Sequence, residues 1–171
     1  MNYAKIKYYD IDNGLGVRTS LFVSGCTHRC KGCFNQETWD FHYGEEFTQK
    51  TIDTILSSCE PVYIKGLTLL GGEPLGPKNQ KALLPLVRQF KEKFPKKDIW
   101  CYSGYTYETD LIDEGGLARC EVTDELLSYI DILVDGEFDQ NLYDIRLKFR
   151  GSSNQRILQL KKPGYPQLFP V

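Results

Sequence analysis

Residues 19–33 read TSLFVSGCTHRCKGC, a short apolar stretch that is followed at once by three closely spaced cysteines. The first part, from Thr19 to Ser24, is rich in β-branched and aromatic residues and predicts a strand. A glycine ends this strand, and Cys26, Cys30 and Cys33 follow in a C-x3-C-x2-C pattern. The sequence therefore predicts a strand that presents a loop of three thiols at its carboxyl end.

Three further strands are predicted downstream, and amphipathic helices separate them. Each strand is a short apolar run stopped by glycine: Gly66–Leu70 before Gly71-Gly72, Asp98–Tyr102 before Ser103-Gly104, and Asp131–Val134 before Asp135-Gly136. Apolar residues at helical spacing predict the helices, which span residues 48–58, 79–94 and 123–129. The stretch from Ile145 to Leu160 is mixed and is predicted to be strand, turn, strand.

The alternation of strands and helices predicts an α/β fold with mostly parallel strands. Right-handed crossovers wind such units into a curved sheet with the helices outside. There are too few units for a closed eight-stranded barrel, which needs ~250 residues, so we expect a partial, open (β/α) barrel. No repeat, low-complexity segment or linker divides the chain, so residues 1–171 are predicted to form a single domain.

The glycine-rich breaks indicate where a ligand site lies. In parallel α/β folds, ligands bind at the carboxyl ends of the strands. All the breaks named above follow a predicted strand directly. We therefore expect one mouth of the sheet to gather the cysteine loop, the Gly-Gly-Glu turn at residues 71–73 and the two later loops.

The overall composition is typical of a soluble globular protein. The 171 residues carry a formal net charge of −2, which provides no basic field for nucleic acid. The N-terminus shows no apolar leader, and no apolar run is long enough to cross a bilayer. We therefore expect a cytoplasmic protein that needs neither nucleic acid nor a membrane. Thiols stay reduced in that compartment, so the six cysteines indicate a metal site before a disulfide framework.

Two kinds of metal site are open for the three clustered thiols. Thiolates are soft ligands that suit iron–sulfur clusters, zinc or Cu(I). An iron–sulfur cube usually takes four thiolates, so three thiolates leave one iron open for a substrate. In the alternative, the three thiols bind a zinc ion, and its fourth ligand is one of four further side chains: His28, Cys59, Cys101 or Cys120. The spacing favours the cluster, whereas the zinc site would make the protein a non-catalytic interaction module.

Several motifs together resemble a known superfamily. The cysteine loop after the first predicted strand resembles that of the radical S-adenosylmethionine enzymes. Within that superfamily the chain is similar to the family that activates anaerobic ribonucleoside-triphosphate reductases, as its compact length and the RGSSNQR segment indicate. The similar segments are Asn13–Arg18, Leu21–Cys26, Gly32–Asn35, Gly71–Leu75, Asp98–Trp100, Ser103–Tyr105, Val134–Phe138 and Arg150–Arg156. Residues 107–120 look longer than is usual in this family.

The resemblance implies a [4Fe–4S] cluster on Cys26, Cys30 and Cys33, with the amino and carboxylate groups of S-adenosylmethionine on the remaining iron. An electron from the reduced cluster would cleave the S–C5′ bond, and the 5′-deoxyadenosyl radical would abstract hydrogen from a glycine of the reductase. The cluster and S-adenosylmethionine carry this chemistry, so no side chain is expected to act as a catalytic residue. The implied partners are the reductase and an electron donor such as a flavodoxin-like protein.

The same resemblance assigns contacts to S-adenosylmethionine. The Gly-Gly-Glu turn is expected to receive the methionyl ammonium, through its carbonyls or its carboxylate. The residues around the third cysteine are expected to face adenine, and a serine-glycine pair to face the ribose. The expected cofactor-binding residues are Gly32, Cys33, Phe34, Gly71, Gly72, Glu73, Ser103 and Gly104.

Some residues and functions stay open at this point. His28 is expected to be a solvated loop side chain, because an open iron must not be capped. Arg150–Arg156 is either a surface turn or a contact for the cofactor or the partner. Two other enzyme functions remain, an activase for a formate-lyase type of glycyl-radical enzyme and a radical enzyme that acts on a small molecule. A small, open barrel favours a protein substrate over a small molecule, because a protein brings its own lid.

Overall fold

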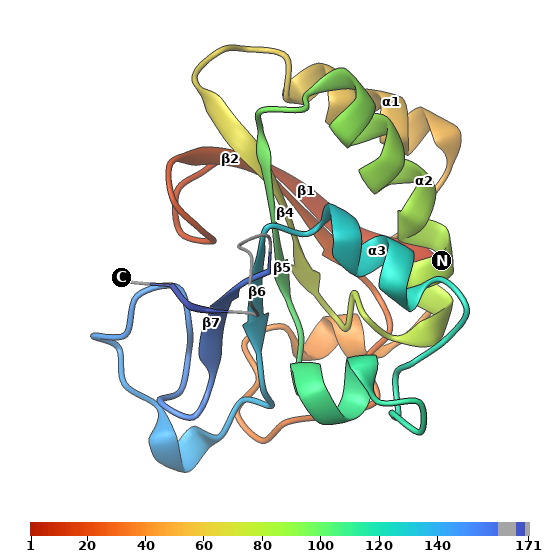
Figure 1. Cartoon of the computed structure of the whole chain (residues 1–171). Coiled ribbons are helices and arrows are strands. Elements are labelled where there is room, and N and C mark those ends of the chain that lie inside the picture. The colour runs from red at the N-terminus through yellow and green to blue at the C-terminus, as the bar shows by residue number, and fades with distance from the viewer. Residues whose placement is uncertain (161–166, 170–171) are drawn as a thin grey trace.

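The computed structural model describes residues 1–160 and 167–169, and the strands in this part of the chain form one sheet (Figure 1). The strand order is β3-β1-β2-β4-β5-β6-β7-β8. The strands are β1 Asn2–Asp10, β2 Val17–Val23, β3 Glu45–Glu46, β4 Ile64–Gly71, β5 Asp98–Tyr102, β6 Ile132–Asp135, β7 Arg156–Gln159 and β8 Gln167–Leu168. The α-helices are α1 Gln49–Ser58, α2 Pro77–Lys93 and α3 Thr123–Tyr129, and shorter helical turns span Gln36–Trp39, Tyr107–Ile112 and Gln140–Leu142.

The middle of the sheet is parallel, as predicted, whereas both edges are antiparallel. β2, β4, β5 and β6 are neighbours and run in the same direction. β1 and β3 extend the sheet antiparallel on one side, and β7 and β8 on the other. The prediction of mostly parallel strands is therefore wrong at the edges. The links from β1 to β2 and from β6 to β7 contain no crossover α-helix, and a parallel pair needs such a crossover.

The predicted elements lie within two residues of the observed β2, β4, β5, β6, α1, α2 and α3. β1 was not predicted, because its sequence NYAKIKYYD shows no clean alternation and only Asp10 of it is fully buried. Between Ile145 and Leu160 only β7 forms, so the predicted strand, turn, strand is half wrong. The predicted domain also covers residues 161–166 and 170–171, which lie outside the described residues.

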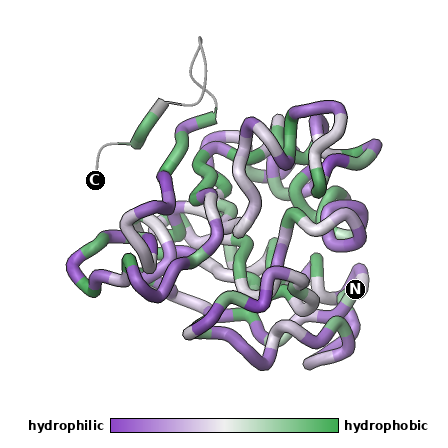
Figure 2. The backbone as a smooth tube through the Cα atoms, turned by 90° about the horizontal axis from the view of Figure 1, so that it is seen from below, coloured by the Kyte–Doolittle hydropathy of each residue, from purple (hydrophilic) through white to green (hydrophobic). Residues whose placement is uncertain are grey.

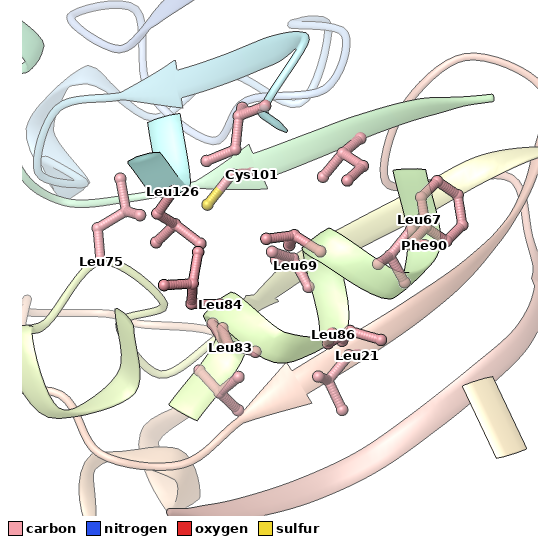
Figure 3. Packing of buried hydrophobic residues seen from close by; sticks show 14 of the residues in the cluster. Leu21, Leu67, Leu69, Leu75, Leu83, Leu84, Leu86, Phe90, Cys101 and Leu126 are labelled. Atoms are coloured by element: carbon pink, nitrogen blue, oxygen red, sulfur yellow. The ribbon is translucent and has the colours of Figure 1, made fainter. Parts of the chain in front are cut away.

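α1, α2 and α3 bury their apolar faces against one face of the sheet, which we call the helix face (Figure 3). Side chains alternate along a strand, so every second residue of the central strands points to these helices. Residues of this core from the strands are Leu21, Leu67, Leu69 and Cys101, and residues from the helices are Leu83, Leu86, Phe90 and Leu126. This layer fixes how the central strands lie side by side, and with them the loops at their carboxyl ends.

The opposite face of the sheet, which we call the inner face, has a different character. It carries a smaller apolar group of Trp100, Ile132, Val134 and Ile157. Buried polar side chains lie beside it, above all Arg18, which donates to the Thr68 hydroxyl (2.7 Å) and pairs with Asp98. Figure 2 shows hydrophilic and hydrophobic residues interspersed along the chain. A polar inner face suits a sheet that holds a ligand there.

The described residues contain no helix that combines the length and the apolar character needed to cross a membrane.

Candidate functional site

A cavity of about 490 Å³ opens on the inner face, at the carboxyl ends of the central strands. Phe22 of β2, Leu70 of β4 and Tyr102 of β5 contribute to its walls. The rest of the lining comes from the loops that follow these strands, from the segment 136–155 between β6 and β7, and from Asp12 and Asn13 in the loop between β1 and β2. The structure thus brings together the glycine-rich breaks that are far apart in the sequence.

Nine of the ten residues predicted as ligands line this cavity: Cys26, Cys30, Cys33, Phe34, Gly71, Gly72, Glu73, Ser103 and Gly104. The tenth, Gly32, does not line it. Gly32 has a φ of +75°, which favours glycine, and a Cβ there would lie 3.0 Å from the Gln140 side chain. Its role in this structure is therefore to let the cysteine loop turn beside residue 140.

The cysteine loop is fastened at both ends. The Gly25 N–H donates to the Thr38 carbonyl (2.8 Å), and the Cys26 N–H donates to the Trp39 carbonyl (3.2 Å). Gly25 has a φ of +96°, and a Cβ there would lie 2.3 Å from the Phe41 ring. Only glycine fits this position, so the loop leaves β2 and returns to it along a fixed path.

Backbone N–H groups face all three sulfurs in this loop. The Asn35 N–H donates to the Cys33 Sγ at 3.4 Å. The other donors are His28 and Arg29 at Cys26, and Phe138 at Cys30. Such donors stabilise negative charge on sulfur and are one of the means by which proteins tune iron–sulfur clusters.

The Cys26 and Cys30 thiols are protonated at neutral pH when no metal holds them. Burial raises the pKa of the Cys26 thiol. Burial, together with the nearby Glu137 carboxylate, raises the pKa of the Cys30 thiol to about 12. Metal binding has to displace these protons, as it does at any thiolate site.

The three cysteines can be compared with what a single metal ion and a cluster require. Within the described residues, no group of three or more His, Cys, Asp and Glu side chains is close enough to hold one metal ion. A cluster binds each thiolate to a different iron, so its cysteines need not converge on one point. The three remaining cysteines, Cys59, Cys101 and Cys120, do not line the cavity, and two of them are buried in the helix-face core.

Glu73 is buried and its carboxylate ties three loops together. Its Oε1 accepts hydrogen bonds from the Ser103 hydroxyl (2.8 Å) and from the Leu75 N–H (2.8 Å). Its Oε2 accepts from the Gly104 N–H (2.7 Å) and lies 3.1 Å from the His28 Nε2. A carboxylate has about four acceptor positions, and this one uses all of them within the protein.

His28 is not the solvated side chain that the sequence suggested. Its side chain is only 13% exposed, its Nε2 contacts Glu73, and its ring lies edge-on to Tyr105 with centroids 4.5 Å apart. The hydrogen bond to Glu73 raises the pKa of His28. The expectation was wrong because a single loop sequence gives no sign of a partner 45 residues away. His28 therefore anchors the cysteine loop to the ends of β4 and β5.

The Arg150–Arg156 segment builds one wall of the cavity. The Gln155 Oε1 accepts from the N–H groups of Gly151 (2.9 Å) and Ser152 (3.1 Å), and its Nε2 donates to the Gly136 carbonyl (3.0 Å). The Asn154 Nδ2 donates to the Glu137 carbonyl (2.8 Å). These amide side chains tie the segment to the loop that follows β6, so the motif is a scaffold as well as a surface turn.

The two arginines of this segment point to different places. Arg156 does not line the cavity and is bound by Asp135 and Glu108. It thereby ties β7 to the helical turn at 107–112, a contact made by the stretch that looked unusually long. Arg150 does line the cavity.

An aromatic group stands at the mouth of the cavity. Phe34 is 67% exposed, and its ring lies 5.4 Å from Phe138 and 5.9 Å from Tyr143. Trp39 and Tyr102 also line the cavity, and the Trp39 Nε1 and the Tyr102 hydroxyl are buried without a partner among the described residues. Trp39, Tyr102, Phe138 and Tyr143 were not predicted as site residues. The one signal was that Tyr102 and Phe138 stand beside glycine-rich breaks.

Comparison with known proteins agrees with this site. Residues 12–158 match the family described as a 4Fe-4S single cluster domain. The chain is 43% identical over 157 residues to the anaerobic ribonucleoside-triphosphate reductase-activating protein of Enterobacteria phage T4, covering 92% of this chain and 93% of the relative. The proteins of the same name from Vibrio cholerae serotype O1 and Escherichia coli K12 are 45% and 42% identical, covering 92% and 94% of this chain and 97% and 100% of theirs. The chain therefore belongs to the family of anaerobic ribonucleoside-triphosphate reductase-activating proteins and contains a 4Fe-4S single cluster domain.

Proposed function

We propose that this protein activates an anaerobic ribonucleoside-triphosphate reductase, with a [4Fe–4S] cluster on Cys26, Cys30 and Cys33 and S-adenosylmethionine on the fourth iron. One observation carries the proposal: three thiols faced by backbone N–H groups share a cavity with the turns that follow β4 and β5. When bound, the cluster and S-adenosylmethionine supply a 5′-deoxyadenosyl radical that takes a hydrogen atom from a glycine of the reductase. This chain binds, orients and shields these groups.

The Gly71-Gly72 backbone is proposed to receive the methionyl ammonium through its carbonyls. A Cβ at Gly71 would lie 2.8 Å from the backbone of β2, and one at Gly72 would lie 2.7 Å from the Gly25 carbonyl oxygen. There is no room for a side chain, so the turn offers bare backbone to the cavity. We assign the ammonium to these carbonyls and not to the Glu73 carboxylate, because that carboxylate already has four partners.

The proposed contacts to the adenine and the ribose of S-adenosylmethionine come from other residues that line the cavity or stand beside its lining. Phe34 and Cys33 are proposed to face adenine, with Gly32 shaping the turn before them. Ser103 and Gly104 are proposed to face the ribose through their backbone carbonyls, since the Ser103 hydroxyl and the Gly104 N–H both donate to Glu73.

The fold supports a partial, open barrel of the radical S-adenosylmethionine type in a single domain. Four parallel strands occupy the middle of the sheet, helices cover one face, and the cavity opens on the other face. We propose that the antiparallel edges replace the strands that would close a full barrel. This assignment extends to residues 1–171.

The rim of the cavity supports a protein as the substrate. Phe34, Tyr143 and Ile145 line the cavity and expose much of their apolar surface, and Leu142 lies beside them. Exposed apolar groups around a site are typical of surfaces that bind another protein. We propose the reductase as this partner and a flavodoxin-like protein as the electron donor. We further propose that the protein works in the cytoplasm, without a membrane or nucleic acid.

The test is anaerobic reconstitution of six single Cys→Ser variants. Serine at Cys26, Cys30 or Cys33 should abolish bound iron and the visible absorbance of the cluster. Serine at Cys59, Cys101 or Cys120 is the matched control and should retain the iron. The wild type, given reductase, S-adenosylmethionine and a reductant, should produce a glycyl-radical EPR doublet on the reductase.

Three results would contradict the proposal. A colourless protein with one tightly bound zinc ion would support the interaction module. A radical on a formate-lyase type enzyme, and none on the reductase, would change the partner. Turnover of a metabolite without any protein partner would change the substrate class.

A further inference from the structure

We propose that Arg150 is the carboxylate-binding residue of the cavity and that its guanidinium receives the methionyl carboxylate of S-adenosylmethionine. The inference rests on the proposed function, because S-adenosylmethionine is the proposed ligand. It concerns a residue whose role the sequence left open between a surface turn, the cofactor and the partner.

Arg150 is held in place and still has free donors. Its Nη1 donates to the Gln155 carbonyl (2.6 Å), and Gln155 in turn is fixed by its own bonds to Gly151 and Gly136. The Nε of Arg150 is buried and has no partner among the described residues, and no hydrogen bond there involves its Nη2. A buried donor without an acceptor is costly, so this edge of the guanidinium is suited to an incoming acceptor.

The backbone before Arg150 is in an unusual conformation. Phe149 has a φ of +57°, a value that non-glycine residues rarely adopt. Its ring packs edge-on against Trp100 with centroids 5.4 Å apart, and this packing holds the turn. Backbone strain of this kind clusters at active sites and at segments that clamp ligands.

The residue after Arg150 lies next to the end of the cysteine loop. A Cβ on the adjacent Gly151 would lie 2.9 Å from the Phe138 ring and 3.3 Å from the Phe34 ring. Phe34 directly follows the third cysteine. Arg150 and the three thiols line the same cavity, so we infer that a ligand bound at the metal site can also contact Arg150.

The charges around the cavity single out Arg150. It is the only Arg or Lys among the described residues that line the cavity. The three carboxylates in the lining have partners already: Glu73 in its four hydrogen bonds, Asp144 with Arg146, and Asp12 with Lys7. A ligand carboxylate that enters the cavity therefore meets one permanent positive charge, the Arg150 guanidinium, which still has N–H groups available to donate.

The chemistry of the ligand matches this donor edge. S-adenosylmethionine has one carboxylate, and an oxygen that is not bound to iron remains free to accept hydrogen bonds. Arginine presents N–H groups in a planar fork that fits a carboxylate. Lysine offers a single point charge and would reproduce only part of this interaction.

The experiment measures equilibrium binding to the cluster-loaded protein by anaerobic dialysis, with two ligands. One is S-adenosylmethionine, and the other is its decarboxylated form, which keeps the sulfonium and the amine. Arg150→Gln should weaken the binding of S-adenosylmethionine about 10–100-fold, the usual loss for a charge-assisted hydrogen bond, and should change binding of the decarboxylated ligand less than about 3-fold. Arg150→Lys should restore part of the loss.

Lys148→Gln is the matched control, because Lys148 lies on the same segment, is exposed and does not line the cavity. Its variant should bind both ligands like the wild type. Equal weakening of both ligands by Arg150→Gln would overturn the proposal and indicate a structural role. Unchanged affinity for S-adenosylmethionine with weakened binding of the reductase would overturn it in favour of a carboxylate on the partner.

The failure of this inference is distinguishable from failure of the proposed function. If the wild-type protein with its cluster binds no S-adenosylmethionine, the proposed function fails. If the wild type binds it and Arg150→Gln binds it equally well, only the role of Arg150 fails.

Discussion

Glu73 shows how one side chain can hold the geometry of a whole site. Its four hydrogen bonds join the cysteine loop, the turn after β4 and the loop after β5. Hydrogen bonds to a charged, buried group contribute more than those between neutral groups. Glu73 therefore acts by positioning the loops that carry the ligands.

We predict that Glu73→Gln lowers the free energy of unfolding by about 2–3 kcal/mol. An amide has one acceptor oxygen where the carboxylate has two, so either the Ser103 and Leu75 donors on Oε1 or the Gly104 donor on Oε2 lose their acceptor. Urea unfolding of the cluster-free protein, with thiols kept reduced, measures this change. Glu60→Gln is the control, because Glu60 pairs only with Lys93 on the surface, and it should have little effect. A Glu73→Gln protein as stable as the wild type would show that Glu73 does not hold the loops.

At the residue scale, the sequence predicted which side chains gather but not how they bond to one another. The spacing of the three cysteines, the glycines after each strand and the family resemblance together identified nine residues that line the cavity. The partners of Glu73 were not predictable, because they come from positions 28, 103 and 104. Such contacts depend on the packing of three strands, which no local pattern reports.

At the scale of elements, α2 contains one proline at a position that favours proline, its first turn, and another at a position that disfavours it, its interior. Pro77 stands at the beginning of the helix, where its missing N–H costs nothing. Pro85 stands inside the helix, where it cannot donate to the carbonyl four residues earlier. The apolar face of α2, with Leu83, Leu86 and Phe90 buried against the sheet, stabilises the helix despite the missing hydrogen bond at Pro85.

Pro85→Ala should raise the free energy of unfolding by about 1–3 kcal/mol, since proline costs about 3 kcal/mol more than alanine inside a helix. Pro85 is exposed, so the change removes no packing. Thermal or urea unfolding measures the gain. Pro77→Ala is the matched control and should give no gain, because proline is favoured at the first turn. Equal effects of the two variants would contradict this account.

Elements with a strong local pattern were predictable and the edge strands were not. α1 to α3 and the four parallel strands show helical or apolar patterns that reflect burial on the helix face. β1 lies toward one edge of the sheet and mixes lysines with tyrosines, so its pairing with β2 decides its structure. β7 is four residues long and pairs with β6 and β8, and its own short sequence carries no strong local pattern.

At the scale of the whole molecule, a buried carboxylate links stability to pH. Asp10 is fully buried at the end of β1 and accepts hydrogen bonds from Ser20 (2.6 Å) and Asn13 (2.7 Å). Burial alone would raise the pKa of Asp10, but hydrogen bonds from Lys7, Ser20 and Asn13 outweigh it and lower the pKa to about 2. The ionised form of Asp10 therefore stabilises the folded protein more than the unfolded chain.

Because the pKa of Asp10 is lower in the folded protein than in the unfolded chain, the stability of the fold decreases as the pH falls. Above about pH 5 the contribution is fully present, and it is lost as the pH falls toward about 2. We expect the wild type to lose about 1–2 kcal/mol more stability between pH 7 and pH 2.5 than Asp10→Asn, allowing for solvent screening near the partly exposed Lys7. Urea unfolding of the cluster-free protein at both pH values measures this. Asp53→Asn, which changes an exposed aspartate on α1, should behave like the wild type, and identical losses in the wild type and Asp10→Asn would refute the role of Asp10.

The order of the cavity walls along the chain has a consequence for biosynthesis. The thiols belong to the first fifth of the polypeptide, whereas the opposite wall begins at Gly136. At ~5–20 residues per second, a ribosome needs roughly 5–20 s to translate the intervening stretch. During that interval the nascent chain carries three thiols that the later wall does not yet cover. Iron delivered before translation ends would therefore meet a binding cavity whose opposite wall is missing.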